Sequence, residues 1–407
     1  MSSKLCELAW KPVVVTVDPQ HYEETNDEAS LALLPHNLQV ERVGAWPARF
    51  CRPLGIGDVS IRGQWTMRSK VRELVNRGNV DLVFATVLPG YTSLIGAWAK
   101  RKLGLPFVLD YQDPWVSDWS AKQPRLSKAG LSHWLARNLE PGAVAAADAL
   151  TAVSGQTLNS LRVRHLLKTG VPTETIPIGA DPNDHDVARR VGRSWIRRDP
   201  DEFVLAYTGT IIEGMLPCVR TLFRSVRALT DANPSPRILI HFIGTSADPS
   251  GKDALGLMGL AEELGVGRVF RLEPRRIGYL DALRSMQDAD ALLLLGSRAS
   301  HYTASKLFPC WLSGKPVLAL FHAASTVNEL AAELGGVHLV KYDNQEGPET
   351  RVDETARVLR QLIEHDSVAL RPRNQSAFEP YSSRGTAQRY AALFDRVVAE
   401  RGLMRRP

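Results

Sequence analysis

The sequence predicts two consecutive α/β domains, each with a parallel sheet covered by helices on both faces, followed by a terminal helix. Two observations support this fold class. The chain has 407 residues. A single hydrophobic core rarely extends over a chain of this length, so two domains are expected. Short, continuously apolar β runs also alternate with segments of helical periodicity through both halves, a pattern typical of parallel sheets buried on both faces.

In the N-terminal half, predicted strands alternate with predicted helices. Buried strands are expected at 11–18, 80–87 and 106–111. Between the last two, the apolar spacing indicates a helix that stops at Gly104. Residues 139–150 predict a helix leading into the strand "ALTAVS", and Ser154 is placed to cap the helix that follows.

The C-terminal half repeats the alternation after a polar, charged passage at 183–202. Its strands are expected at 203–210, 237–244, 268–273, 289–296, 315–321 and 337–342. The segment 382–402 has the pattern of one amphipathic helix.

These elements define the expected domains. We place the N-terminal domain at 1–190, the C-terminal domain at 200–375 and a terminal helix, which could cross back to the N-terminal domain, at 376–407. Doubly wound sheets bind ligands at the carboxyl ends of their strands, so a central crevice between two such domains is the expected site.

Composition narrows the class of protein. With 44% hydrophobic and 23% charged residues, the chain is expected to be a soluble globular protein. The N-terminus lacks the pattern of a signal peptide, and the longest apolar runs have strand length. The four cysteines are scattered without metal-binding spacing, which favours reduced thiols in a cytoplasm.

The net charge of +6 is mild. It fits an anionic substrate or an acidic membrane surface, or simply a basic protein. No run combines basic and aromatic residues in a nucleic-acid motif, so no nucleic-acid partner is expected. The histidines show no paired spacing and no neighbouring cysteines, so no metal site is expected. No cofactor is expected either.

Several stretches together resemble family 4 glycosyltransferases. They are "VDLVFATVLPGYTSLIGAWAKRKLGLPFVLDYQDPW", "ADALTAVSGQTLNSLR", "TIPIGAD", "YTGTI", "ADALLLLG" and "SKLFPCWLSGKPVLAL". The resemblance covers about residues 80–325 and depends on the order and spacing of these motifs. It implies a GT-B fold, with an acceptor in the N-terminal domain and a nucleotide sugar, UDP- or GDP-linked, in the C-terminal domain. It also implies metal-independent transfer with retention at the anomeric carbon to a glycan, a lipid-linked glycan or a small molecule, as in polysaccharide biosynthesis.

The stretch "TASKLFPCWLSGKPVLAL" carries the expected phosphate site. Proline is tolerated in the first turn of a helix, so Pro309 predicts a helix that begins at 305–308. Its free N–H groups, the Lys306 charge and the hydroxyls of Thr303 and Ser305 would bind a diphosphate and stabilise the departing phosphate. The alternative is that Lys306 is a solvated residue and Ser305 an ordinary cap.

Neighbouring residues complete the predicted donor site. His301 and Tyr302 precede the phosphate loop, and Leu307 offers a backbone N–H. Gly209 and Thr210 follow a strand, where a glycine lets a backbone approach a phosphate or sugar closely; ordinary tight turns use the same residues.

Two positions depart from the family pattern. Pro309 stands where the family has a glutamate that binds the ribose, and Glu213 stands where many members have a basic residue. Arg275, Arg276 or Arg298 could supply the missing charge. We favour Arg275 as a catalytic residue because it follows a strand end, although an exposed arginine in a salt bridge is an equal alternative.

The acceptor side is expected around a second strand end. Asp110 and Asp113 could bind an acceptor hydroxyl or deprotonate it, with Asp113 as the catalytic candidate or as a loop brace. Gln112 replaces an arginine common in the family. His21 and Glu23, in the loop after the first strand, are further candidates for acceptor binding, or simply solvated.

Other functions stay open at this level. Because the ribose-binding glutamate is missing, the protein could instead be a GT-B relative with other chemistry, such as a coupling enzyme or a nucleotide-sugar epimerase. A non-catalytic nucleotide-sugar-binding protein is the second alternative. The pattern at 128–139 fits an amphipathic helix in peripheral contact with the inner membrane face, or a helix packed on the sheet.

Overall fold

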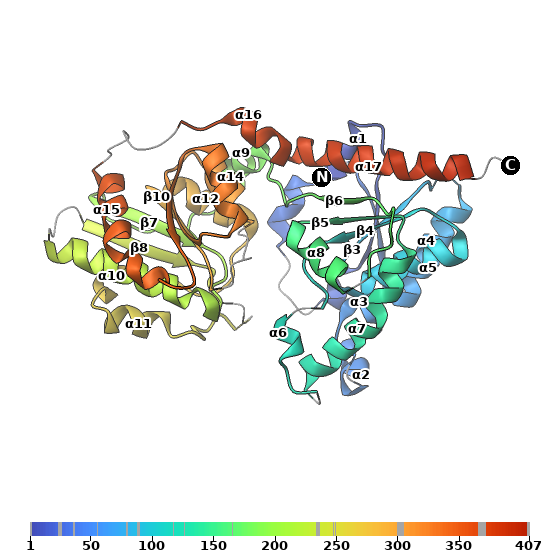
Figure 1. Cartoon of the computed structure of the whole chain (residues 1–407), viewed down its shortest axis with the longest axis horizontal. Coiled ribbons are helices and arrows are strands. Elements are labelled where there is room, and N and C mark those ends of the chain that lie inside the picture. Colours follow the sequence, from blue (N-terminus) through green and yellow to red (C-terminus); the bar gives the residue numbers. More distant parts are fainter. Residues whose placement is uncertain are drawn as a thin grey trace. The chain divides into compact units, whose positions relative to one another are not determined.

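A computed structural model of the chain describes residues 2–404, apart from 23–26, 36, 55, 79, 88–89, 117, 126, 165, 233–236, 247, 249, 299–304 and 365–371. Two compact units make up the chain (Figure 1). Unit 1 consists of Met1–Asn26, Pro35–Ile178 and Ser383–Pro407, and unit 2 consists of Asp27–Leu34 and Gly179–Ser382. The chain therefore passes between the units more than once.

Unit 1 contains a parallel sheet, as the sequence predicted, but the strand expected at 11–18 is not part of it. Its four strands follow the order β3-β4-β5-β6. They are β3 (Val83–Thr86), β4 (Phe107–Tyr111), β5 (Ala149–Ala152) and β6 (Thr173–Thr175). A separate parallel pair is formed by β1 (Val13–Val17) and β2 (Gln39–Val43).

The helices of unit 1 follow local signals that the sequence shows. Apart from the last helix of the chain, they are α1 (Ser2–Cys6), α2 (Ala48–Cys51), α3 (Val59–Arg62), α4 (Gln64–Asn76), α5 (Ser93–Leu103), α6 (Asp118–Ala121), α7 (Lys128–Ala146) and α8 (Gly155–Val163). The expected stop at Gly104 is confirmed, since this residue ends α5 with a φ of 69°. The expected cap is confirmed too, since the Ser154 hydroxyl accepts from the Thr157 amide at the start of α8.

Unit 2 is a six-stranded parallel sheet in the order β12-β11-β10-β7-β8-β9. Its strands are β7 (Glu202–Thr208), β8 (Arg237–Ile243), β9 (Phe270–Glu273), β10 (Ala291–Leu295), β11 (Val317–His322) and β12 (Val337–Tyr342), all six at the expected places. Its helices are α9 (Pro182–Val191), α10 (Leu216–Ala232), α11 (Leu257–Glu263), α12 (Tyr279–Asp288), α13 (Leu307–Leu312), α14 (Thr326–Leu334), α15 (Val352–Ile363) and α16 (Gln375–Phe378).

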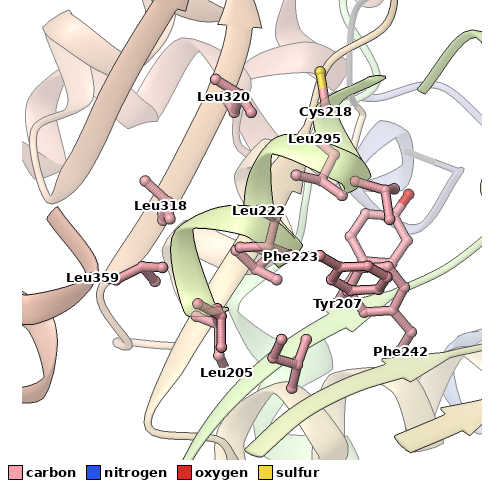
Figure 2. Close-up of a cluster of buried hydrophobic side chains, with 14 of the residues drawn as sticks. Leu205, Tyr207, Cys218, Leu222, Phe223, Phe242, Leu295, Leu318, Leu320 and Leu359 are labelled. Atoms are coloured by element: carbon pink, nitrogen blue, oxygen red, sulfur yellow. The ribbon is translucent and has the colours of Figure 1, made fainter. Parts of the chain in front are cut away.

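Both faces of the sheet in unit 2 are buried. On β7, Leu205 and Tyr207 point to one face, where they pack with Phe223 of α10 and Phe242 of β8 (Figure 2). Val204 belongs to the cluster on the other face, together with residues of α12, α13 and α14. Since successive side chains of a strand point to opposite faces, this double burial explains why the strand sequences are continuously apolar.

The first boundary between the units differs from the expected one, whereas the terminal helix crosses back to unit 1 as the sequence allowed. The first boundary falls between Ile178 and Gly179, so α9 and the charged passage after it belong to unit 2. The last helix, α17 (Ser383–Met404), belongs to unit 1, where Tyr390 and Phe394 join a buried cluster with residues of β4 and β5. Among the described residues, no helix has both the length and the apolar character needed to cross a membrane.

Candidate functional site

The carboxyl ends of the central strands in unit 2 form one continuous edge. Gly209, directly after β7, donates its N–H to the carbonyl of Ile243 at 2.7 Å. Gly244, directly after β8, donates in the same way to the carbonyl of Glu273 at 2.7 Å. A Cβ on Gly244 would lie 3.8 Å from both the Gly209 and the Ile277 nitrogens. The loops after β7, β8 and β9 are therefore in close backbone contact at this edge.

Lys306 lies at this edge and contacts the end of β7. Its Nζ donates to the Tyr207 hydroxyl at 3.0 Å and lies 4.5 Å from the centroid of the Tyr207 ring. The Tyr207 hydroxyl donates in turn to the carbonyl of Thr210 at 2.9 Å. The ammonium group thus has a defined position beside the loop that follows β7.

Gly209 makes room for this lysine. Its φ of 106° is a backbone conformation that residues with side chains rarely adopt. A Cβ here would lie 2.4 Å from the Lys306 Nζ. The backbone conformation therefore favours the glycine predicted from the sequence, and a side chain at this position would displace the Lys306 ammonium group.

The surroundings of Lys306 lower the pKa of its ammonium group. Desolvation by burial lowers the pKa of Lys306 to about 8, and the positive charge of Arg276 contributes to the lowering. Each of these effects disfavours the ammonium form in the free protein. An anion bound at this edge would favour the ammonium form and so oppose them, which means that the arrangement suits a negatively charged ligand.

The helix α13 begins where the sequence predicted. It starts at Leu307, with Lys306 as the residue before it, so Pro309 falls in the first turn. His185 of α9 holds this turn, because its Nε2 lies 2.9 Å from the carbonyl oxygen of Pro309. A carbonyl only accepts, so Nε2 carries the proton, and burial lowers the pKa of His185, which keeps the ring neutral.

The other predicted donor residues have different surroundings. Ser305 is exposed in the turn before α13, whereas the Leu307 side chain is buried in the core, so only its backbone could reach a ligand. His301, Tyr302 and Thr303 lie outside the described residues.

Among the arginines weighed as a charge source, Arg276 is the one that acts on Lys306. Arg275, which the sequence favoured, is exposed like Arg276, and its amide donates to Glu273 in a local turn. Arg298 lines a pocket of about 480 Å³ together with Glu213, and the other lining residues are Gly214, Leu216, Pro217, Arg220 and Glu349. The acidic Glu213 and a possible replacement charge therefore share one pocket in unit 2.

On unit 1, Asp110 lies inside the sheet. Its Oδ1 accepts from the Thr151 hydroxyl at 2.5 Å and from the Tyr390 hydroxyl at 3.1 Å, and its Oδ2 accepts from Gln112. The side chain is completely buried. This environment ties α17 to β4, and the acceptor-binding role of Asp110 stays a prediction.

Asp113 lies in the turn that follows β4. Partial burial raises the pKa of Asp113 above its ordinary value, which brings a carboxylate closer to the basicity useful for general-base catalysis. Trp115 braces this turn, since its ring packs edge-on against Tyr91 at 5.4 Å and leaves no space for a side chain at Gly90.

His21 ends a 3₁₀ turn after β1, and its backbone is held by a residue that sequence reasoning missed. The buried guanidinium of Arg62 donates to the carbonyls of His21 at 2.9 Å, of Trp46 at 2.7 Å and of Gly57 at 3.3 Å. Arg62 thereby fixes three loops of unit 1. Glu23, predicted beside His21, lies outside the described residues.

Sequence reasoning also missed Tyr207, the partner of Lys306. It appears in the sequence as one more apolar position of a buried strand, and only its place directly before Thr208-Gly209 hinted at the edge of the sheet. Within the described ranges, no group of His, Cys, Asp or Glu residues has an arrangement that could hold a metal ion.

The comparisons with known proteins agree with this architecture. Residues 1–179 match the family described as "Glycosyl transferase 4-like domain". No curated protein sequence matches the chain significantly.

Solved structures of similar fold cover nearly the whole chain. The sucrose-phosphate synthase of Thermosynechococcus elongatus has a TM-score of 0.56 at 14% identity, and the match covers 100% of this chain and 90% of that one. HepE of Anabaena, in complex with UDP and glucose, has a TM-score of 0.53 at 16% identity, covering 96% and 98%. The α,α-trehalose 6-phosphate synthase of Burkholderia multivorans has a TM-score of 0.60 at 12% identity, covering 96% and 100%.

At these identities the solved structures establish the fold. They confirm the GT-B fold class predicted from the sequence, and the match over residues 1–179 supports the resemblance to family 4 glycosyltransferases in that part of the chain. This chain is thus a GT-B protein that carries a glycosyl transferase 4-like domain at residues 1–179.

Proposed function

We propose that this protein transfers a glycosyl group from a nucleoside diphosphate sugar to a hydroxyl group of an acceptor, with retention at the anomeric carbon. The observation that carries the proposal is the Lys306 ammonium group, held at the carboxyl edge of unit 2 between Tyr207 and Gly209. HepE binds UDP-glucose, which favours a UDP-linked donor.

Lys306 has the chemistry that a leaving diphosphate requires. Breaking the bond between sugar and diphosphate leaves negative charge on the departing oxygen, and a preorganised cation there stabilises the transition state. Lys306 and Arg276 together supply positive charge at this edge. We therefore expect turnover that is insensitive to EDTA, and a product whose anomeric configuration, determined by NMR, matches that of the donor.

Acceptor binding is assigned to unit 1. Asp113 is the candidate that orients or deprotonates the acceptor hydroxyl, since its pKa is raised and its turn is braced by Trp115. The acceptor class is a glycan, a lipid-linked glycan or a small molecule that offers a free hydroxyl.

Nucleotide binding tests the proposal directly. Titration calorimetry with UDP, GDP and ADP should show binding of one nucleotide. The Lys306→Ala variant should lose on the order of 1 to 3 kcal/mol, as expected for a charge-assisted phosphate contact. Lys341→Ala, at an exposed position of β12, is the matched control and should bind as the wild type does. Wild-type protein that binds none of the three nucleotides would refute the proposal, and binding without turnover over an acceptor panel would favour a non-catalytic role.

Peripheral membrane contact at the cytoplasmic face is the second part of the proposal. Leu131 and Trp134 of α7 expose 48% and 59% of their surface, and a net charge of +6 suits an anionic lipid surface. Vesicles of phosphatidylglycerol should retain the wild type and release a Leu131→Ser/Trp134→Ser variant. Val163→Ser, at an exposed apolar residue of α8, is the control and should be retained. Equal retention of all three proteins would exclude this contact.

A further inference from the structure

A short N-terminal segment is built into unit 2. Residues Asp27–Leu34 belong to this unit, although the chain before and after them belongs to unit 1. Glu28–Leu33 form a 3₁₀ helix, η2, that contacts α9 and α12. Leu33 packs against the buried cluster on the face of the sheet that α12 and α13 cover.

Asp27 supplies a cap that α12 lacks. The residue before α12 is Gly278, which has no side chain to accept from the first free N–H groups of the helix. The Oδ2 atom of Asp27 accepts from the Tyr279 amide at 2.7 Å. A Cβ on Gly278 would lie 3.0 Å from the Asp27 Oδ1, so a glycine at this position permits the close approach of the carboxylate.

The carboxylate of Asp27 is itself held in place. The Ser30 hydroxyl donates to Oδ2 at 2.6 Å. Partial burial alone would raise the pKa of Asp27, but the hydrogen bonds from Ser30, Tyr279 and Ala29 outweigh it and hold this pKa below its ordinary value. A negative charge at the start of a helix also interacts favourably with the helix dipole.

The capped helix starts next to the candidate donor site. The loop 274–278 joins β9 to α12 and carries Arg276, whose charge acts at Lys306. The same loop packs on the edge, because the Ser246 amide donates to the carbonyl of Pro274 at 2.8 Å and the Ile277 nitrogen lies against Gly244. Asp27 thus fixes one end of the loop whose middle contributes charge to the site.

We infer that Asp27 is a positioning residue for the diphosphate of the donor: by capping α12 from a distant part of the sequence, it holds the loop 274–278 so that Arg276 adds its charge beside Lys306. This inference rests on the proposed function. It also means that the segment Asp27–Leu34 contributes to donor binding in unit 2.

The test compares full-length variants by two measurements. Amide hydrogen exchange of Tyr279 reports the cap in the free protein, and titration calorimetry with UDP, or with whichever nucleotide binds, reports the site. In Asp27→Ala, Tyr279 exchange should become roughly 2- to 30-fold faster, the range expected for losing a cap, and the Kd should rise by a similar factor. Asp27→Asn keeps an acceptor oxygen and should stay closer to wild type on both measurements.

Two further variants separate positioning from general destabilisation. Ser30→Ala removes one bond to the same carboxylate and leaves the cap, so Tyr279 exchange and Kd should change little. In an Arg276→Ala background the effect of Asp27→Ala on Kd should disappear, because Asp27 acts through the loop that carries Arg276.

Additive effects of Asp27→Ala and Arg276→Ala on Kd would overturn the inference. So would faster Tyr279 exchange in Asp27→Ala with an unchanged Kd, which would make Asp27 only a structural cap. Wild-type protein that binds no nucleotide would refute the proposed function and the positioning role with it. In that case the exchange measurement would show whether Asp27 still orders the loop.

Discussion

The Lys306 ammonium group and the Tyr207 ring are in contact in the free protein, with Nζ 4.5 Å from the ring centroid and 3.0 Å from the hydroxyl oxygen. The Tyr207 hydroxyl donates to the Thr210 carbonyl, which leaves its lone pairs for Lys306. A tyrosine is a weak partner for a cation compared with a carboxylate or phosphate. Lys306 is therefore positioned by an uncharged partner, which suits the proposed binding of an anion.

This geometry predicts a pH dependence of nucleotide binding. The pKa of Lys306 is about 8 in the free protein, below its ordinary value, and a bound diphosphate should raise it. The affinity for UDP, or for whichever nucleotide binds, should be constant below pH 8. Above that pH it should fall by up to about tenfold per pH unit. Calorimetry between pH 6.5 and 9.5, in buffers of different ionisation enthalpy, should also show proton uptake on binding. A Lys306→Arg variant stays charged, so any binding that it retains should not weaken over this range.

The same lowered pKa predicts a cost to stability. Folding disfavours the ammonium form of Lys306, so its penalty is fully present below pH 8 and is lost as the pH rises towards 10.5. Lys306→Met should therefore raise the free energy of unfolding at pH 7 by about 1 to 3 kcal/mol. Urea unfolding should show the difference between the two proteins shrinking between pH 7 and pH 9.5. A less stable variant would mean that the Tyr207 contact outweighs the desolvation of the ammonium group.

Gly209 should tolerate no side chain. Gly209→Ala combines a strained φ of 106° with a Cβ placed 2.4 Å from the Lys306 Nζ. We expect a loss of about 1 to 3 kcal/mol in the free energy of unfolding and weaker nucleotide binding. Gly256→Ala is the control, because Gly256 has a φ of 65° and nothing within 4 Å of the new Cβ. It should cost about 1 kcal/mol and leave binding intact. Equal effects on binding would argue that backbone strain alone, and not the collision with Lys306, is responsible.

The buried bond between Tyr390 and Asp110 should contribute to the stability of unit 1. Tyr390→Phe removes one of the donors to a completely buried carboxylate and should cost about 1 to 3 kcal/mol in urea unfolding. Arg396→Ala, at an exposed site on the same helix, should change stability by less than about 0.5 kcal/mol. An unchanged Tyr390→Phe variant would show that Thr151 and Gln112 satisfy Asp110 on their own.

Local signals in the sequence were sufficient for the elements and for part of the site. Gly104 and Ser154 mark a helix end and a helix start by backbone and capping chemistry that acts over a few residues. Pro309 placed the start of α13 for the same reason, and with it Lys306. Gly209 was found because it directly follows a strand.

The partners of these residues were harder to predict. Tyr207 lies 99 positions from Lys306 in the sequence, and its apolar neighbours give it the pattern of a core residue. Arg275 and Arg276 are adjacent, and only the course of the loop decides which of them acts on Lys306. Asp27 is separated from Tyr279 by 252 positions.

The sequence by itself determined the fold class, the positions of most strands, and the lysine and glycine of the candidate site, because burial periodicity, helix stops and the conformational limits of glycine and proline are local properties. The short strands β2 and β6 were not predicted. Only the tertiary structure decided which residues meet. The sheet order β10-β7-β8-β9 brings Lys306 beside the end of β7 and the Asp27-capped loop against the end of β8. The order of strands in a sheet follows from the packing of whole layers of helices and strands, so it cannot be predicted from the residue spacing within a single element.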